Sequence, residues 1–274
     1  MPLKPPYKPL DDVIPAASAG SWTSFARSFR DPTQELAPPW ADVFRPLRLG
    51  AIDDIMAVGQ IGQSLDGRIA TETGHSHYIN GAGGIEHLHR LRALVDAVVI
   101  GVGTALADDP LLTVRRCEGA HPARVVLDPK GRLTAGAKVF AGDGVRRMAI
   151  VAQGTHSALP AGIETIALPA AAGRIAPRDI LTALAERGMK RILIEGGADT
   201  VSCFLAAGCL DRLHVMVAPI ILGSGRAGIA LPPIARADEA LRPTVRMFKI
   251  GDDVLFDCDL SAQRVAVGRT KIST

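Results

Sequence analysis

The sequence is poor in aromatic residues and has no long apolar run. Aromatic residues make up 4% of the 274 residues, whereas hydrophobic residues make up 47%. A core must therefore consist mostly of Val, Ile, Leu and Ala side chains. No apolar run approaches the roughly 20 residues that a membrane helix needs, and no apolar signal core follows Lys4 and Lys8. We therefore expect a globular protein without a membrane partner.

Cysteines are also few, and they lack the spacing of a metal site. The sequence contains no C-x-x-C motif, and its four cysteines fit no zinc pattern. These residues are Cys117, Cys203, Cys209 and Cys258. We expect reduced thiols in a cytoplasmic protein.

Four of the seven histidines form two close pairs, His75/His77 and His87/His89. On a helix, residues two apart point about 200° away from each other, so His87 and His89 do not converge. The other pair has no cysteine or carboxylate at ligand spacing. The sequence therefore predicts no metal site.

Positive charge is modest and dispersed. The formal net charge is +3, and Lys and Arg residues are scattered along the chain. Nucleic-acid binding normally requires a clustered basic face. We therefore expect no nucleic-acid partner, and instead a few arginines that bind phosphate.

The first 46 residues contain nine prolines, a density that disfavours regular helix and sheet. The same segment carries both tryptophans, Trp22 and Trp40, and three of the seven phenylalanines. A disordered tail would not normally contain them. We predict an arm over residues 1–45 that packs on the core or on a partner subunit, a domain over 46–262 and a tail over 263–274.

Strand and helix patterns alternate through the predicted domain. Continuous apolar runs between turn residues predict strands, and apolar residues three and four apart predict helices. We expect strands at 55–62, 97–101, 124–127, 148–152, 163–168, 191–195 and 214–219, helices at 85–95, 180–187 and 200–207, and a hairpin at 245–260. This order predicts an α/β domain with a mostly parallel sheet and an antiparallel edge.

Two glycine-rich turns have the composition of phosphate-binding loops. Glu195-Gly196-Gly197 lies between a predicted strand and a helix, where free N–H groups favour an anion. From the residues alone, a plain chain turn is the favoured explanation. The second turn, 101–106, has Leu106 where the dinucleotide fingerprint has its third glycine. No crossover helix fits residues 108–123, so we reject a classical Rossmann domain.

Two sequence blocks together are far more specific than either turn. The first combines S-L-D-G-R-I-A at 64–70 with G-T-x-L-A-D-D-P-x-L-T-V-R at 103–115. The second combines residues 192–197 with 218–223. Over residues 55–260 the chain resembles the C-terminal reductase domain of the RibD family. The resemblance implies a dihydrofolate-reductase-like α/β fold with a central mostly parallel sheet, an antiparallel edge hairpin and helices on both faces.

The resemblance also implies an NADPH site and a phosphorylated substrate. The matching catalytic carboxylates are Glu195 and Asp108. The matching cofactor residues are Gly62, Tyr78, Thr104, Asp108, Gly196, Gly197, Ala198, Asp199, Thr200, Val201, Ser202 and Cys203. The matching substrate residues are Ser76, Arg92, Leu112, Arg115 and Glu195. Lys130 and Arg132 are additional candidates for the 2′-phosphate of NADPH, and we expect Gly197 to require a positive φ.

The resemblance implies reduction of a phosphoribosylamino-pyrimidine to its ribitylamino form, as in riboflavin biosynthesis, by a homodimer. Two alternatives remain open: a reductase of the same fold acting on a reduced pterin or folate, and a non-catalytic nucleotide-binding protein. The zinc deaminase motifs H-x-E and P-C-x-x-C of bifunctional RibD proteins are absent. The chain therefore resembles the reductase half alone.

Overall fold

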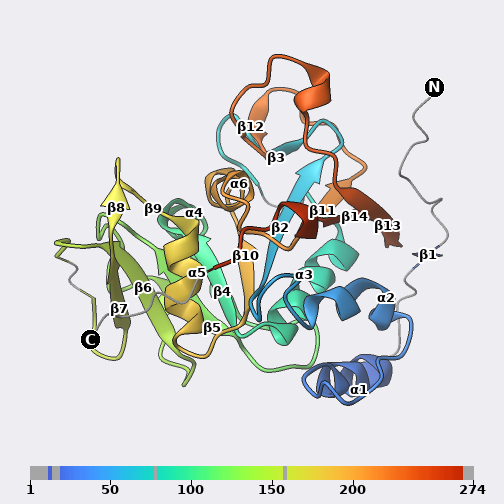
Figure 1. Cartoon of the computed structure of the whole chain (residues 1–274), viewed down its shortest axis with the longest axis horizontal. Helices are drawn as coiled ribbons and strands as arrows, with labels where there is room; N and C mark the ends of the chain where they lie inside the picture. Colours follow the sequence, from blue (N-terminus) through green and yellow to red (C-terminus); the bar gives the residue numbers. More distant parts are fainter. Residues whose placement is uncertain (1–11, 14–18, 77–78, 157–158, 268–274) are drawn as a thin grey trace.

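The computed structural model describes residues 12–13, 19–76, 79–156 and 159–267. Its centre is a ten-stranded sheet in the order β1-β13-β14-β11-β2-β10-β4-β5-β6-β7 (Figure 1). These strands are β1 (Asp12–Val13), β2 (Met56–Ser64), β4 (Ala97–Gly101), β5 (Ala123–Leu127), β6 (Arg147–Ala152), β7 (Glu164–Leu168), β10 (Arg191–Glu195), β11 (Arg212–Ala218), β13 (Thr244–Ile250) and β14 (Asp253–Asp259).

Neighbouring strands from β11 to β7 are all parallel, and β14 runs antiparallel to both β11 and β13. The predicted α/β class, with a mostly parallel sheet and an antiparallel hairpin, is confirmed. One detail differs. The hairpin is not outermost, because β1 pairs in parallel with β13.

Helices cover both faces of the sheet. They are α1 (Ala19–Phe29), α2 (Trp40–Phe44), α3 (Ala82–Leu94), α4 (Val102–Asp108), α5 (Pro177–Ala185) and α6 (Ala198–Ala206). Alternate residues of a strand face opposite sides. Val58 and Leu193 accordingly join the core cluster beneath α1, α2 and α3, while Ala57 and Ile192 join the cluster beneath α5 and α6.

Short elements complete the chain. A two-stranded ribbon of β3 (Arg68–Thr71) and β12 (Gly225–Ala227) stands beside the ends of β2 and α6 (Figure 1). The remaining elements are β8 (Ala170–Ala171), β9 (Arg174–Ile175) and the 3-10 turns η1 (Arg45–Leu47), η2 (Lys138–Phe140), η3 (Ala237–Glu239) and η4 (Ser261–Gln263). No helix in the described part of the chain is long and apolar enough to cross a membrane.

The expectation that proline excludes regular helix from the N-terminal segment is wrong. Its prolines are unevenly spaced, and α1 occupies the proline-free stretch between Pro15 and Pro32. The aromatic side chains of its described part are buried in the core cluster beneath α3. These buried residues are Trp22, Phe25, Phe29, Trp40 and Phe44.

The structure has no helix over residues 109–122, in line with the expectation that no crossover helix fits there, but it has an unpredicted helix just before them. α4 begins directly after β4, with Gly101 as its N-cap, and ends at a left-handed Asp109 with φ of 41°. The sequence argument looked for a helix only after Asp108. A helix of seven residues is too short for a periodic pattern to be visible.

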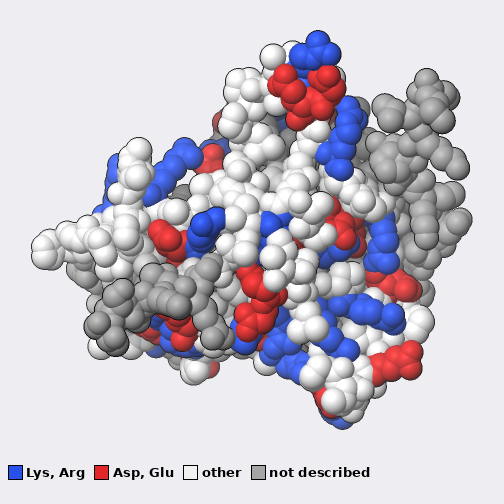
Figure 2. Space-filling view, viewed as in Figure 1, with Lys and Arg blue, Asp and Glu red and all other residues white. Residues whose placement is uncertain are grey.

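Charges are mixed on the visible surface. Figure 2 shows Lys and Arg side chains interspersed with Asp and Glu, without one continuous basic field on this face. The four cysteines, two buried and two half-buried, are all free thiols.

Candidate functional site

A cleft of about 350 Å³ lies at the carboxyl ends of β2 and β10. Side chains and backbone from α3, α4, the ribbon β3/β12 and the turn before α6 complete its walls. In open α/β sheets, ligands bind outside the carboxyl ends of the strands. The cleft brings together seven of the residues predicted for the site: Gly62, Ser76, Thr104, Asp108, Glu195, Gly196 and Gly197.

Glu195 is the buried carboxylate of the cleft, and Arg92 holds it. Arg92 Nε donates to Glu195 Oε2 at 2.8 Å, Nη2 donates to Oε1, and Nη1 donates to the Thr113 carbonyl at 3.1 Å. Both side chains are at least nine-tenths buried. Arg92 does not line the cleft, so it reaches the site through Glu195.

A group of cations lies beside this ion pair. Arg115 donates its backbone N–H to His89 Nδ1 at 2.9 Å and its guanidinium to the Thr113 hydroxyl. Burial, followed by Arg92, Arg115 and Arg116, lowers the pKa of His89 to about 4. His89 is thus a neutral hydrogen-bond acceptor among the arginines near neutral pH.

Leu112 lies elsewhere. Its side chain is 1% exposed in the core cluster, and its backbone has a positive φ of 54°. The Leu112 backbone therefore forms a turn shortly before Arg115, while the Leu112 side chain points into the core. Neither Leu112 nor Arg115 lines the cleft.

The glycine turn at the start of α6 is packed against Thr104. Gly197 donates its N–H to Thr104 Oγ1 at 3.0 Å. Gly196 has φ of +100°, and a Cβ there would lie 3.1 Å from the Thr104 side chain. The expectation of a positive φ at Gly197 is wrong, since its φ is −49°. The left-handed residue of this turn is Gly196.

The remaining predicted residues of α6 do not line the cleft. Val201 is fully buried in the core, and Ser202 Oγ accepts the Ala230 N–H at 2.8 Å. Thr200 packs against Gly101, where a Cβ would lie 2.5 Å from Thr200 Oγ1. Ala198, Asp199 and Cys203 occupy the same helix without lining the cleft. Tyr78 lies outside the described residues.

Three polar side chains of the cleft were not predicted from the sequence: Gln60, Asn80 and Arg226. Gln60 is 7% exposed and lies beside Glu195, its register partner on the neighbouring strand. Its sequence feature is an amide side chain in a mostly apolar strand, which also contains Gln63. Asn80 donates Nδ2 to the Met216 carbonyl at 3.2 Å. Arg226 follows the loop glycines Gly223 and Gly225.

The side chains of Lys130 and Arg132 do not lie on the cleft. Arg132 Nε is 4.0 Å from Asp128 Oδ1, on the loop after β5. Neither residue lines the cavity. The structure thus gives no geometric support to their contact with a 2′-phosphate.

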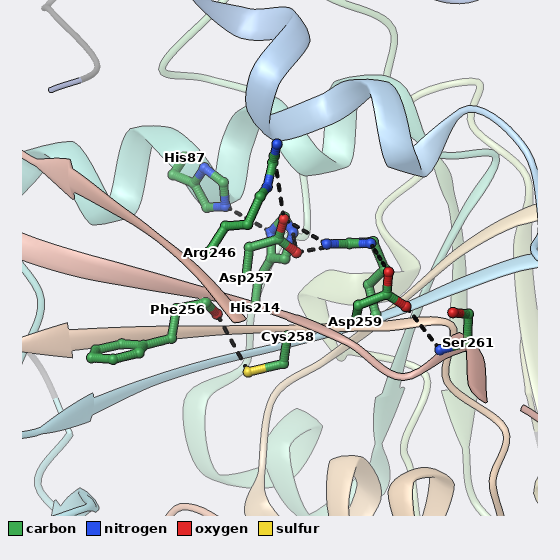
Figure 3. Close-up of polar contacts among 9 residues, drawn as sticks. His87, His214, Arg246, Phe256, Asp257, Cys258, Asp259 and Ser261 are labelled. Carbon is green, nitrogen blue, oxygen red and sulfur yellow. Dashed lines mark hydrogen bonds and ion pairs between the residues drawn. The ribbon is translucent and has the colours of Figure 1, made fainter. Parts of the chain in front are cut away.

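A second polar cluster is buried under α3, next to the cleft (Figure 3). His87 Nε2 and His214 Nδ1 are 3.0 Å apart, and His214 Nε2 is 3.2 Å from Asp257 Oδ1. Arg212 binds both Asp257 oxygens at 2.7 Å. Burial lowers the pKa of His87 well below its ordinary value, and the neighbouring His214 lowers it further. No group of three or more metal-ligating side chains is arranged for a metal among the described residues.

The fold and cleft define an α/β protein with a ligand-sized cleft at the carboxyl edge of its sheet. The chain belongs to the RibD C-terminal domain family, whose model matches residues 58–256.

Relatives include both long and short proteins. The chain is 34% identical over 197 residues to riboflavin biosynthesis protein RibD of Mycobacterium tuberculosis, covering 70% of this chain and 50% of that protein. It is 33% identical over 206 residues to the 2,5-diamino-6-ribosylamino-4(3H)-pyrimidinone 5′-phosphate reductase of Methanothermobacter thermautotrophicus, covering 71% and 93%. The chain thus spans about half the length of its RibD relatives.

A solved structure shares the fold. The deaminase/5-amino-6-(5-phosphoribosylamino)uracil reductase of Thermotoga maritima is 26% identical, with a TM-score of 0.62. The superposition covers 75% of this chain and 56% of that one.

Proposed function

We propose that this protein is an NADPH-dependent reductase that converts a phosphoribosylamino-pyrimidine to its ribitylamino form. The observation that carries the proposal is the cleft, where the Glu195–Arg92 pair and the Gly196-Gly197 turn lie together. One part offers a carboxylate to a sugar, and the other offers backbone to a nucleotide phosphate. The names of the relatives support the same reaction class.

The start of α6 fits a nucleotide phosphate. Among the described residues, the N–H groups of Ala198 and Asp199 have no acceptor, as expected in the first turn of a helix. Such groups and the positive end of the helix dipole favour an anion. A side chain at Gly196 would contact Thr104, so the turn stays open to the cleft.

NADPH supplies the hydride when it is bound. In the ring-opened substrate, the sugar is an imine at C1′, so reduction requires a hydride at C1′ and a proton at nitrogen. Glu195 accepts one N–H from Arg92 on each oxygen, and each oxygen keeps a second acceptor position. We assign it the orientation of sugar hydroxyls. Asp108 is exposed on the cleft wall, and we assign to it the exchange of a proton with solvent.

On the family resemblance we assign the substrate phosphate to Arg115, which lies outside the lining of the cleft, and the sugar to Ser76, which lines it. Arg115 is exposed, and its guanidinium interacts electrostatically with Arg92, Arg116 and Glu195. Burial, followed by Arg92 and Arg116, lowers the pKa of the Arg115 guanidinium, and an incoming phosphate relieves this repulsion. The side-chain nitrogens of Arg92 are already hydrogen-bonded to Glu195 and Thr113. Arg92 therefore attracts the phosphate through its positive charge and not through a direct hydrogen bond.

The test is NADPH oxidation with the phosphorylated aminopyrimidine and its dephosphorylated analogue. A charge-assisted hydrogen bond contributes roughly 1.5 to 3 kcal/mol, so the wild type should prefer the phosphorylated substrate about tenfold to a hundredfold. Arg115→Ala should lose most of this preference. A wild type that ignores the phosphate contradicts the proposal and favours a pterin substrate. Tight NADPH binding without turnover of either class favours a non-catalytic protein.

We also propose a cytoplasmic homodimer. The free thiols support the compartment, and the family resemblance supports the dimer. Light scattering at micromolar concentration should give twice the mass of the 28.8 kDa chain. A monomer mass in that measurement contradicts the assembly without affecting the proposed reaction.

A further inference from the structure

Arg226 is the only Lys or Arg among the described residues that line the cleft. Its guanidinium is on the exposed side of β12 and, within the described part of the chain, makes no hydrogen bond or ion pair. Arg92, by contrast, has all its nitrogens engaged. The cleft, which Asp108 and Glu195 also line, therefore contains one guanidinium without a partner among the described residues.

Hydrogen bonds fix the backbone of the loop that leads into β12 and Arg226. Asp66 accepts the Leu222 and Gly223 N–H groups at 3.1 and 2.7 Å, and Arg68 Nε donates to the Gly223 carbonyl at 3.1 Å. Hydrogen bonds from the Ser64 hydroxyl and the Leu222 N–H lower the pKa of Asp66 to about 2. Asp66 thus remains an acceptor at any physiological pH.

Two local features direct Arg226 toward the cavity. At Gly225 a Cβ would lie 2.4 Å from the Ala70 carbonyl oxygen, so only glycine allows β12 to approach β3 this closely. The strand register shifts between Arg226 and Ala227, and such bulges re-aim side chains beside functional sites. Arg226 pairs with Ala70, and both line the cleft.

The ribbon is also tied to the predicted nucleotide side of the cleft. Ala230, four residues after Arg226, donates its N–H to Ser202 Oγ of α6 at 2.8 Å. Gly228 donates to the Gly67 carbonyl at 2.9 Å. The segment that carries Arg226 is therefore bonded to the helix whose first turn borders the same cavity.

We infer that Arg226 binds a phosphate group of the ligands that fill the cleft, and that it closes the site from the side of the ribbon. An arginine fork binds phosphate bidentately, and Arg226 forms no ion pair with Asp108 or Glu195, the two carboxylates among the described cleft residues. This inference rests on the proposed function for the identity of the ligands. The phosphate belongs either to the cofactor or to the substrate, and the experiment separates them.

The experiment measures dissociation constants for NADPH and NADH, and catalytic efficiency with the phosphorylated and dephosphorylated substrates. The variants are Arg226→Gln, Arg226→Lys and the control Arg236→Gln, which removes an exposed cation paired with Asp238 outside the cleft. Arg226→Gln should weaken one phosphorylated ligand about tenfold or more, with partial recovery in Arg226→Lys and no change in the control.

The pattern locates the phosphate. A loss for NADPH alone assigns the 2′-phosphate, an equal loss for NADPH and NADH assigns the pyrophosphate, and a loss only for the phosphorylated substrate assigns that group. Unchanged values for all four ligands, or changes equal to those of Arg236→Gln, overturn the inference. Circular dichroism of each variant checks that the ribbon still folds.

A separate binding measurement tests Arg226 independently of the proposed reaction. Calorimetric titration with 2′-phosphoadenosine and with inorganic pyrophosphate reports phosphate binding without any turnover. If the wild type reduces neither substrate but binds one of these probes through Arg226, the inference stands and the reaction assignment fails. If neither probe responds to Arg226→Gln, the inference fails whatever the enzyme reduces.

Discussion

At the scale of single residues, Thr104 positions the glycine turn. Its Oγ1 accepts the Gly197 N–H. Its methyl and hydroxyl groups occupy the position next to Gly196, where they would lie 3.1 Å from an added Cβ. We predict that Thr104→Val weakens NADPH binding about fivefold, because a hydrogen bond worth roughly 1 kcal/mol is lost. Thr104→Ser should retain the bond and most of the affinity. The measurement is NADPH titration, and equal affinity in Thr104→Val contradicts the role.

Arg92 is a second residue whose importance lies in its partner. Removing it leaves the Glu195 carboxylate buried without its counter-ion, and breaking a buried ion pair costs about 3 to 5 kcal/mol. We predict that Arg92→Met lowers the free energy of unfolding by about this amount in urea denaturation. The double variant Arg92→Met/Glu195→Met should be more stable than Arg92→Met alone. The opposite order would show that the pair does not act as a unit.

At the scale of elements, α2 is anchored by Trp40. This side chain is 1% exposed, and the Arg90 guanidinium of α3 lies 3.9 Å from its ring centroid. Truncating a buried tryptophan costs about 3 to 5 kcal/mol. We predict that Trp40→Ala lowers the free energy of unfolding by this amount and reduces activity at a temperature where the wild type is folded. A change below about 1 kcal/mol would show that the segment is dispensable for stability.

The strands were predictable where many apolar residues follow one another. β4, β6 and β10 are bounded within one residue of the predicted limits, because each is a continuous apolar run between turn residues. Apart from α1 in the proline-rich segment, the elements that were missed are short. β3 and β12 form only a few pairs and depend on contacts such as Asp66 with Gly223, which are distant in sequence. The same distance explains why Arg226 was absent from the predicted site.

At the scale of the whole molecule, one polar row joins the cleft to the buried cluster. Five residues pair in register across five adjacent strands: Arg246, Asp257, His214, Gln60 and Glu195. α3 crosses above them and bonds the row twice, through His87 to His214 and through Arg92 to Glu195. Sequence patterns predict each strand separately, but this row depends on the strand order, which no local pattern contains.

The same row couples the N-terminal helices to the sheet and gives the protein a pH-dependent stability. Phe44 of α2 stacks on His87 at 5.3 Å between ring centroids. His87 is buried, and its pKa is lowered by burial first and His214 second, so the folded chain binds fewer protons than the unfolded chain below the ordinary histidine pKa of 6.5. The contribution of neutral His87 to the free energy of unfolding is therefore fully present above about pH 6.5 and is lost as the pH decreases.

We predict that the free energy of unfolding decreases between about pH 7 and pH 5, by at most about 1.4 kcal/mol per pH unit for each such histidine. His89, whose pKa is lowered to about 4, adds a loss of the same sign. His87→Leu should be less stable at neutral pH but show a shallower slope, because one proton-linked group is gone. The exposed His156 provides the control, and His156→Gln should keep the wild-type slope. Urea denaturation across this pH range measures both slopes, and an unchanged slope in His87→Leu would assign the acid sensitivity to groups outside the row.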